Sequence, residues 1–133
     1  MTPYVADPVY LNGRFLPLAE AGISPLDRGF LYGDGVYELI PVYSQRPFRL
    51  AEHLTRLQAT LDGIRLTNPL DVAGWTAVVE RLIADAPWAD QSIYLQVTRG
   101  ADNKRDHAFP SAGVPSTAFA FSSPLVTTPA DIR

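Results

Sequence analysis

Two residues in a polar loop of this 133-residue chain could bind a carboxylate together. Arg105 and His107 are two positions apart, and in an extended segment alternate side chains point the same way. The planar guanidinium fork of an arginine and a second donor from a histidine suit a carboxylate. The alternative is a solvated loop, because Asp102, Lys104 and Asp106 surround the pair. The residues alone favour the solvated loop.

A third candidate, Arg56, stands beside the apolar stripe of a predicted helix, between Leu54 and Leu57. Its guanidinium could hold a phosphate through several donors at once. It could equally pair with Glu52 one turn earlier, or lay its stem on the core. Arginines at the border of a helix usually have a structural role, and His53 on the same helix is also interpreted as structural.

A glycine-rich block from Asp27 to Glu38 comes directly before a predicted strand. Two glycines bracket Asp34, and glycine permits a tight turn or a close approach of the backbone to a ligand. Isolated glycine-rich segments are weak signals of binding. Local chemistry therefore favours a loop closed by an Asp27–Arg28 type pair and by hydrogen bonds of Asp34.

The strands that must position these residues lie toward both ends of the chain. Asn-Gly at 12–13, between short apolar runs, predicts a hairpin. Residues 36–43 are rich in β-branched and aromatic side chains and predict a strand, which a turn at 44–47 reverses. Pro41 places that strand at an edge or at a bulge. Residues 92–98 and 117–121 alternate between two faces, as strands do.

Two helices are predicted between these groups of strands. Leucines recur at spacings of four and three from Leu50 to Ile64, which predicts one amphipathic helix. A second is predicted to start near Asn68-Pro69 and to end at Pro87. Together the elements predict an α+β fold, an antiparallel sheet with helices packed on one face. Residues 1–121 form this domain, and residues 122–133, which have no clear period, are expected to begin an interdomain linker.

Composition narrows the function classes. The net charge of −3 gives no reason to expect nucleic acid or an anionic membrane as a partner. The chain has no cysteine, and its histidines and acidic residues lack the spacing of a metal site, so no metal is expected. No apolar stretch indicates a signal peptide or a membrane span, and we expect a cytoplasmic protein.

Taken in order, these segments resemble the landmarks of the class IV (fold-type IV) pyridoxal-phosphate aminotransferases, and most closely the amino-terminal domain of D-amino-acid aminotransferases. The resemblance covers essentially the whole chain. The Arg-x-His pair favours the D-amino-acid branch over branched-chain aminotransferases and aminodeoxychorismate lyases. Pro41 departs from the more usual strand residue. The matching segments are Asp27-Arg28-Gly29, Gly33-Asp34-Gly35-Val36-Tyr37-Glu38, His53-Leu54-Thr55-Arg56-Leu57, Val97-Thr98-Arg99-Gly100 and Arg105-Asp106-His107.

The resemblance implies a role for four residues. Arg56 matches the arginine that binds the phosphate of pyridoxal 5′-phosphate. Tyr37, Arg105 and His107 match the residues that grip the substrate carboxylate. In this family the loop that bears the Arg-x-His pair reaches into the site of the partner subunit, so a homodimer is implied. The implied substrates are small molecules, a D-amino acid and a 2-oxo acid.

The lysine that such chemistry requires is not evident. Lys104 is the only lysine, and it lies in a polar loop where nothing would desolvate it. The resemblance places the Schiff-base lysine in a second domain beyond Arg133, so this chain is expected to hold no catalytic residue and to be inactive alone. Two alternatives stay open: a class IV lyase such as an aminodeoxychorismate lyase, and a stand-alone binding or dimerisation module.

Overall fold

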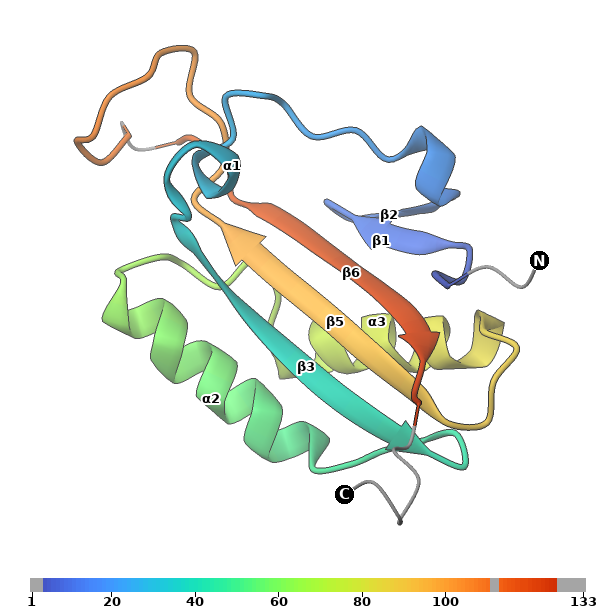
Figure 1. Cartoon of the computed structure of the whole chain (residues 1–133). Coiled ribbons are helices and arrows are strands. Elements are labelled where there is room, and N and C mark those ends of the chain that lie inside the picture. The colour runs from blue at the N-terminus through green and yellow to red at the C-terminus, as the bar shows by residue number, and fades with distance from the viewer. Residues whose placement is uncertain (1–3, 111–112, 127–133) are drawn as a thin grey trace, which may run out of the picture.

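The computed structural model describes residues 4–110 and 113–126. The fold is built around an open antiparallel sheet (Figure 1). Within those residues the sheet has six strands in the order β2-β1-β6-β5-β3-β4. The long central pairs are β3 with β5 and β5 with β6, which match residue for residue over most of their length. The strands are β1 (Val9–Leu11), β2 (Arg14–Leu16), β3 (Gly35–Tyr43), β4 (Arg46–Pro47), β5 (Gln91–Thr98) and β6 (Thr117–Pro124).

Two long helices, α2 (Leu50–Gly63) and α3 (Val72–Asp85), pack against one face of this sheet (Figure 1). Their buried leucines and Trp75 meet the inward side chains of the strands, such as Ile40, Ile93 and Leu95. The α+β fold with helices on one face is therefore confirmed. Two shorter helices are the 3₁₀ turn η1 (Leu18–Glu20) and α1 (Arg28–Tyr32).

The opposite face of the sheet carries aromatic side chains. Strand alternation puts Val36 toward the helices and Tyr37 on the other side, where Tyr37 is 65% exposed. Tyr37 stacks on Tyr94, Tyr94 contacts Phe121, and Phe121 contacts Phe119, with ring centroids 5.7, 5.3 and 5.6 Å apart. The sheet thus presents aliphatic residues to the core and an aromatic row to the outside.

Pro41 lies close to the edge of the sheet, as predicted. Strand β3 pairs with β5 along most of its length but with β4 only at Val42 and Tyr43. The carbonyl of Pro41 accepts a hydrogen bond from Phe48 N at 2.8 Å, on the side away from β5. The N–H that proline lacks would point to that same side, so the ladder with β5 is intact.

Several predicted boundaries were wrong. The turn expected at 44–47 is shorter, because Arg46–Pro47 form β4 and pair with β3. The glycine-rich block is not only a loop, because Arg28–Tyr32 form α1: Asp27 Oδ1 accepts from Gly29 N at 2.8 Å, and Gly33 ends the helix in a left-handed conformation. Helix α3 starts at Val72 rather than near Asn68, because Asp71 caps it through Gly74 N at 2.7 Å.

Strand β6 also runs past the predicted end at Phe121. Ser122 is buried and its hydroxyl donates to Gln91 Oε1 at 2.7 Å, so polar pairing continues the strand to Pro124. Residues 122–124 therefore belong to the sheet rather than to a linker. The rest of the predicted linker, residues 127–133, lies outside the described residues.

None of the helices in the described ranges is long and apolar enough to cross a membrane.

Candidate functional site

Arg56 is held by a carboxylate that approaches from the edge of the sheet. Helix α2 lies along β3, and Arg56 Nε donates to Glu38 Oε2 while Nη2 donates to Oε1, both at 2.8 Å. This two-bond fork replaces the predicted alternative pairing with Glu52, which lies 3.6 Å from Arg49 instead. Glu38 is on the core side of β3, two residues from Val36 and Ile40, so strand alternation aims its side chain at α2.

A histidine completes the environment of Glu38. His53 Nδ1 lies 2.7 Å from Oε1, and the Glu38 side chain is only 4% exposed. Burial by itself would raise the pKa of Glu38, but hydrogen bonds from Arg56 and His53, together with their charges, outweigh it and lower the pKa. Glu38 is therefore ionised at neutral pH, and His53 must carry a hydrogen on Nδ1 to make this bond.

The outer side of Arg56 remains available to a ligand. Its side chain is 66% exposed, and its hydrogen bonds to described residues use only Nε and Nη2. Nη1 and the second Nη2 hydrogen therefore face outward beside a shallow pocket of about 250 Å³. A guanidinium fixed on one side and exposed on the other can hold an anionic group such as a phosphate.

Tyr37 borders the same strand edge from the other face. The hydrogen bond to Glu38 and then the charge of Glu38 raise the pKa of Arg56. Burial raises the pKa of Tyr94, and the neighbouring Tyr37 raises it further. Tyr37 directly precedes Glu38 on β3, and Glu38 binds Arg56 and His53. We call these four residues the strand-edge cluster.

The loop that bears the Arg-x-His pair is anchored through its backbone. Arg28 Nη1 donates to the carbonyl of Asp106 at 2.6 Å, and Nη2 donates to that of His107 at 3.4 Å. Asp34 Oδ2 accepts from Nε of both Arg28 and Arg99 at 2.9 Å, and the two arginine side chains are each 8% exposed. The predicted hydrogen bonds of Asp34 are confirmed.

The predicted pair between Asp27 and Arg28 was wrong. Asp27 is buried and instead binds Gly29 N, the Thr98 hydroxyl at 2.7 Å and the Thr117 hydroxyl at 2.6 Å. Its neighbour Arg28 is turned toward Asp34 and the loop. Asp27 therefore bonds to strands β5 and β6, whereas its neighbour Arg28 bonds to Asp34 and to the loop.

Arg105 and His107 meet over a single aromatic ring. The Arg105 guanidinium carbon lies 5.3 Å from the centre of the Tyr32 ring, and the His107 ring lies 4.8 Å from it. The Tyr32 hydroxyl is buried and finds no hydrogen-bond partner within residues 4–110 and 113–126. We call these three residues the loop cluster. Sequence reasoning missed Tyr32, although an aromatic residue directly before Gly33 in the glycine-rich block was a signal for it.

The four predicted site residues thus fall into two clusters in one chain. Tyr37 lies on β3 and Arg56 is bound to β3 through Glu38, whereas Arg105 and His107 both contact Tyr32 at the end of α1. Both loop side chains are exposed, as the solvated-loop interpretation expected, but both also contact the Tyr32 ring.

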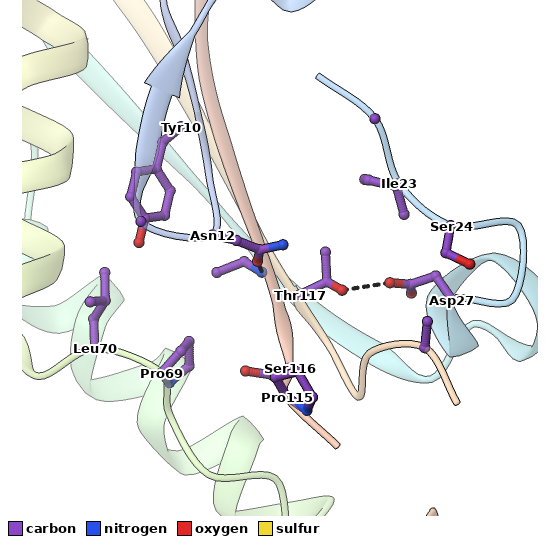
Figure 2. Close-up of a pocket in the computed structure, with 14 residues that line it drawn as sticks. Tyr10, Asn12, Ile23, Ser24, Asp27, Pro69, Leu70, Pro115, Ser116 and Thr117 are labelled. Atoms are coloured by element: carbon purple, nitrogen blue, oxygen red, sulfur yellow. Dashed lines mark hydrogen bonds between the residues drawn. The ribbon is translucent and has the colours of Figure 1, made fainter. Parts of the chain in front are cut away.

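A larger pocket, of about 650 Å³, is lined by no residue of either cluster (Figure 2). The hairpin turn at 12–13, Leu70 and the segment 115–118 line it, and the picture shows the Thr117 hydroxyl bonded to Asp27. The one carboxylate in its lining, Asp27, already accepts three hydrogen bonds. None of the four predicted site residues lines this pocket, so it is not the candidate site.

A sequence profile described as amino-transferase class IV matches residues 35–132, which includes all four predicted site residues. Among curated proteins, a D-alanine aminotransferase of Listeria innocua is 36% identical over 102 residues, covering 77% of this chain and 35% of the relative. One of Staphylococcus epidermidis is 34% identical over 114 residues, covering 86% of this chain and 40% of the relative. The chain therefore spans well under half the length of these relatives.

Solved structures share the fold. A branched-chain aminotransferase from T.th., solved with pyridoxamine 5′-phosphate, superposes with a TM-score of 0.84 at 23% identity, over 96% of this chain and 43% of that one. The branched-chain aminotransferase of Escherichia coli gives 0.82 at 20% identity, over 90% and 41%. At these identities the likeness establishes the architecture of the sheet and its helices. With the profile match and the curated relatives, it follows that the chain belongs to the class IV aminotransferase family.

Proposed function

We propose that the protein carrying this chain is a pyridoxal-phosphate-dependent aminotransferase that moves an amino group between a D-amino acid and a 2-oxo acid. The observation that carries the D-amino-acid assignment is the loop cluster, where Arg105 and His107 meet over the Tyr32 ring. The curated relatives named D-alanine aminotransferase support it. The branched-chain aminotransferases are similar in fold only, at 20–23% identity.

The strand-edge cluster fits the phosphate of this cofactor. Arg56 offers an outward set of guanidinium donors, and its inner donors are fixed by Glu38. The planar donor fork of an arginine matches a phosphate dianion better than the point charge of a lysine does. When bound, pyridoxal phosphate supplies an electron sink for the reacting amino acid, and the protein supplies binding, orientation and proton transfer.

The substrate carboxylate would be held by Arg105 and His107 together with Tyr37. A guanidinium and an imidazole give a carboxylate two directional donors, and the Tyr37 hydroxyl gives a third. Because Tyr37 stacks on Tyr94 while the loop pair contacts Tyr32, one chain presents these donors as two separate groups. A homodimer in which the loop of one subunit reaches the strand edge of the other would unite them.

Lys104 does not suit the role of the reactive lysine. Its side chain is 71% exposed, and its ammonium lies 3.7 Å from Asp106. A lysine that attaches this cofactor and moves the proton needs a desolvated position next to the ring. We therefore propose that the reactive lysine lies in a part of the protein outside this chain, with the chain contributing half of the site. Borohydride reduction of the 133-residue chain with pyridoxal phosphate should then give no stoichiometric adduct on Lys104.

The test of the proposed function is a steady-state assay of the full-length protein with D-alanine and 2-oxoglutarate. Formation of pyruvate and glutamate supports the proposal, with L-alanine and L-leucine as controls for stereochemistry and side chain. Turnover of L-leucine in place of D-alanine would replace the D-amino-acid assignment with a branched-chain one. Turnover of aminodeoxychorismate alone would favour the lyase alternative. Mapping the end of the reading frame separates both enzymes from a stand-alone binding module.

A further inference from the structure

The least expected feature of the strand-edge cluster is the buried carboxylate behind Arg56. An exposed arginine needs no counter-ion, because water solvates it, yet Glu38 is 4% exposed and gives both carboxylate oxygens to Arg56 and one of them also to His53. Burial of a carboxylate is unfavourable unless it is paired and hydrogen-bonded. The arrangement therefore points to a role for Glu38 that acts through Arg56.

We infer that Glu38 is a positioning residue, which fixes the Arg56 guanidinium so that its outer edge is ready to receive the cofactor phosphate. The inference rests on the proposed function, since it takes Arg56 as the phosphate ligand. Two parallel hydrogen bonds set the plane of the guanidinium and leave Nη1 on the outside. Glu38 itself does not touch the cofactor.

His53 keeps the carboxylate in place. It lies one helical turn before Arg56 on α2, and its Nδ1 holds Oε1 at 2.7 Å while Arg56 Nη2 holds the same oxygen at 2.8 Å. The His53 side chain is itself largely buried, at 16% exposure. Rotation of the carboxylate would break bonds to both residues, so the orientation of Arg56 is fixed by the sheet as well as by the helix.

A competing effect makes the test decisive. The negative charge of Glu38 partly cancels the positive charge of Arg56. If charge alone mattered, removal of the Glu38 charge would strengthen phosphate binding. Water around the exposed Arg56 screens this effect. In the other direction, an unrestrained arginine loses rotamer freedom when it binds, which weakens affinity by up to about thirtyfold. We therefore expect orientation to dominate and removal of the carboxylate to weaken binding.

The experiment compares two ligands of the full-length protein that differ only in the phosphate, pyridoxamine 5′-phosphate and pyridoxamine. Neither has the aldehyde, so neither attaches covalently, and their affinities can be measured by fluorescence without turnover. Glu38→Gln should weaken pyridoxamine 5′-phosphate by about five- to tenfold, because one of the two fork bonds and its charge are lost. Pyridoxamine affinity should stay within about twofold. Glu80→Gln, which removes the same charge from the exposed surface of α3, should change neither.

A double-mutant cycle separates this inference from the proposed function. Arg56→Ala should weaken pyridoxamine 5′-phosphate at least as much as Glu38→Gln does, and Glu38→Gln should add nothing in the Arg56→Ala background. Unchanged affinity in Arg56→Ala overturns the proposed phosphate role of Arg56. A clear loss in Arg56→Ala, with unchanged or tighter binding in Glu38→Gln, overturns the positioning role of Glu38 alone.

A second variant covers the case in which Glu38→Gln does not fold. Arg56→Lys keeps the charge on an exposed side chain but cannot form the two-bond fork with Glu38. If orientation matters, Arg56→Lys should lose nearly as much pyridoxamine 5′-phosphate affinity as Arg56→Ala. Retention of wild-type affinity in Arg56→Lys overturns the inference, because charge without orientation would then be sufficient.

Discussion

The strand-edge cluster and the loop cluster are built in opposite ways. At the strand edge the side chain of the proposed phosphate ligand is itself held, because Arg56 gives two of its donors to Glu38. In the loop the backbone is held, because Arg28 binds the carbonyls of Asp106 and His107 while the side chains of Arg105 and His107 stay exposed. One region fixes an individual group, and the other fixes the segment that carries two groups.

This difference indicates how each region should respond to change. Loss of Glu38 should affect Arg56 and leave the loop as it is, since no element of the Arg28 network is involved. Loss of the Arg28 network should instead release the whole loop with both its side chains. The following experiments test that contrast, in decreasing order of the expected effect.

Asp34→Ala should produce the largest loss. It leaves the buried guanidinium groups of Arg28 and Arg99 without their shared carboxylate, which typically lowers the free energy of unfolding by about 3–5 kcal/mol. Urea unfolding of the 133-residue chain measures it. The matched control is Asp85→Ala, which breaks a surface pair with Arg81 and should lower stability by less than about 1 kcal/mol. Equal losses in the two variants would contradict the role given to Asp34.

Arg105→Ala should weaken the substrate grip without touching the cofactor. Loss of a charge-assisted hydrogen bond corresponds to about 2 kcal/mol, or roughly thirtyfold in apparent affinity for amino and oxo acids. His107→Ala should act in the same direction more weakly. Pyridoxamine 5′-phosphate affinity should be unchanged in both. Lys104→Ala is the control from the same loop, and unchanged substrate kinetics in Arg105→Ala would remove Arg105 from the proposed site.

Glu38→Gln should lose stability only where Glu38 is ionised. Its pKa in the folded chain lies below the ordinary value of 4.5, so its contribution is fully present above that value and disappears as the pH falls through the lowered folded-state pKa. At about pH 7 we expect the variant to be less stable by about 1–2 kcal/mol. Thermal unfolding of both proteins from about pH 7 to about pH 3 should show the gap closing. A gap that stays constant would mean that packing, not charge, accounts for it.

Tyr32→Phe should have the smallest effect. A buried hydroxyl without a partner in the described part of the chain adds no hydrogen bond, so its removal should be neutral or raise stability by up to about 1 kcal/mol. The ring that Arg105 and His107 contact stays in place. Urea unfolding of the 133-residue chain gives the value. A loss of more than about 1 kcal/mol would show that the hydroxyl is engaged in solution.

Much of the fold could be predicted because the spacing of apolar residues along the sequence indicates which side chains are buried. Alternation in residues 92–98 and the leucine spacing from Leu50 to Ile64 both correspond to what packs against the core. The boundaries that were wrong depend on polar contacts instead. Helix α3 starts where Asp71 caps it, and β6 continues because Ser122 bonds to Gln91. Apolar periodicity reports neither contact.

The candidate site could be predicted only as separate residues. A clue to the partner of Arg56 was present, because alternation puts Glu38 on the same face as Val36 and Ile40, and a buried carboxylate requires a cation. The anchoring of the loop by Arg28 left no such clue, because the bonded groups are 78 and 79 positions apart. Contacts between residues so far apart in the sequence depend on how β3, β5 and β6 pair, and a local sequence pattern does not reveal that pairing.

Pro41 has a further consequence for how the protein behaves at high concentration. Unpaired edges of strands can recruit another chain and start aggregation. Strand β3 has such an edge from Gly35 to Ile40, where its only partner among the described strands is β5. At Pro41 the edge has no N–H to offer, and its carbonyl is already taken by Phe48. We therefore expect a growing intermolecular sheet to be interrupted at this position of the strand that carries Tyr37 and Glu38.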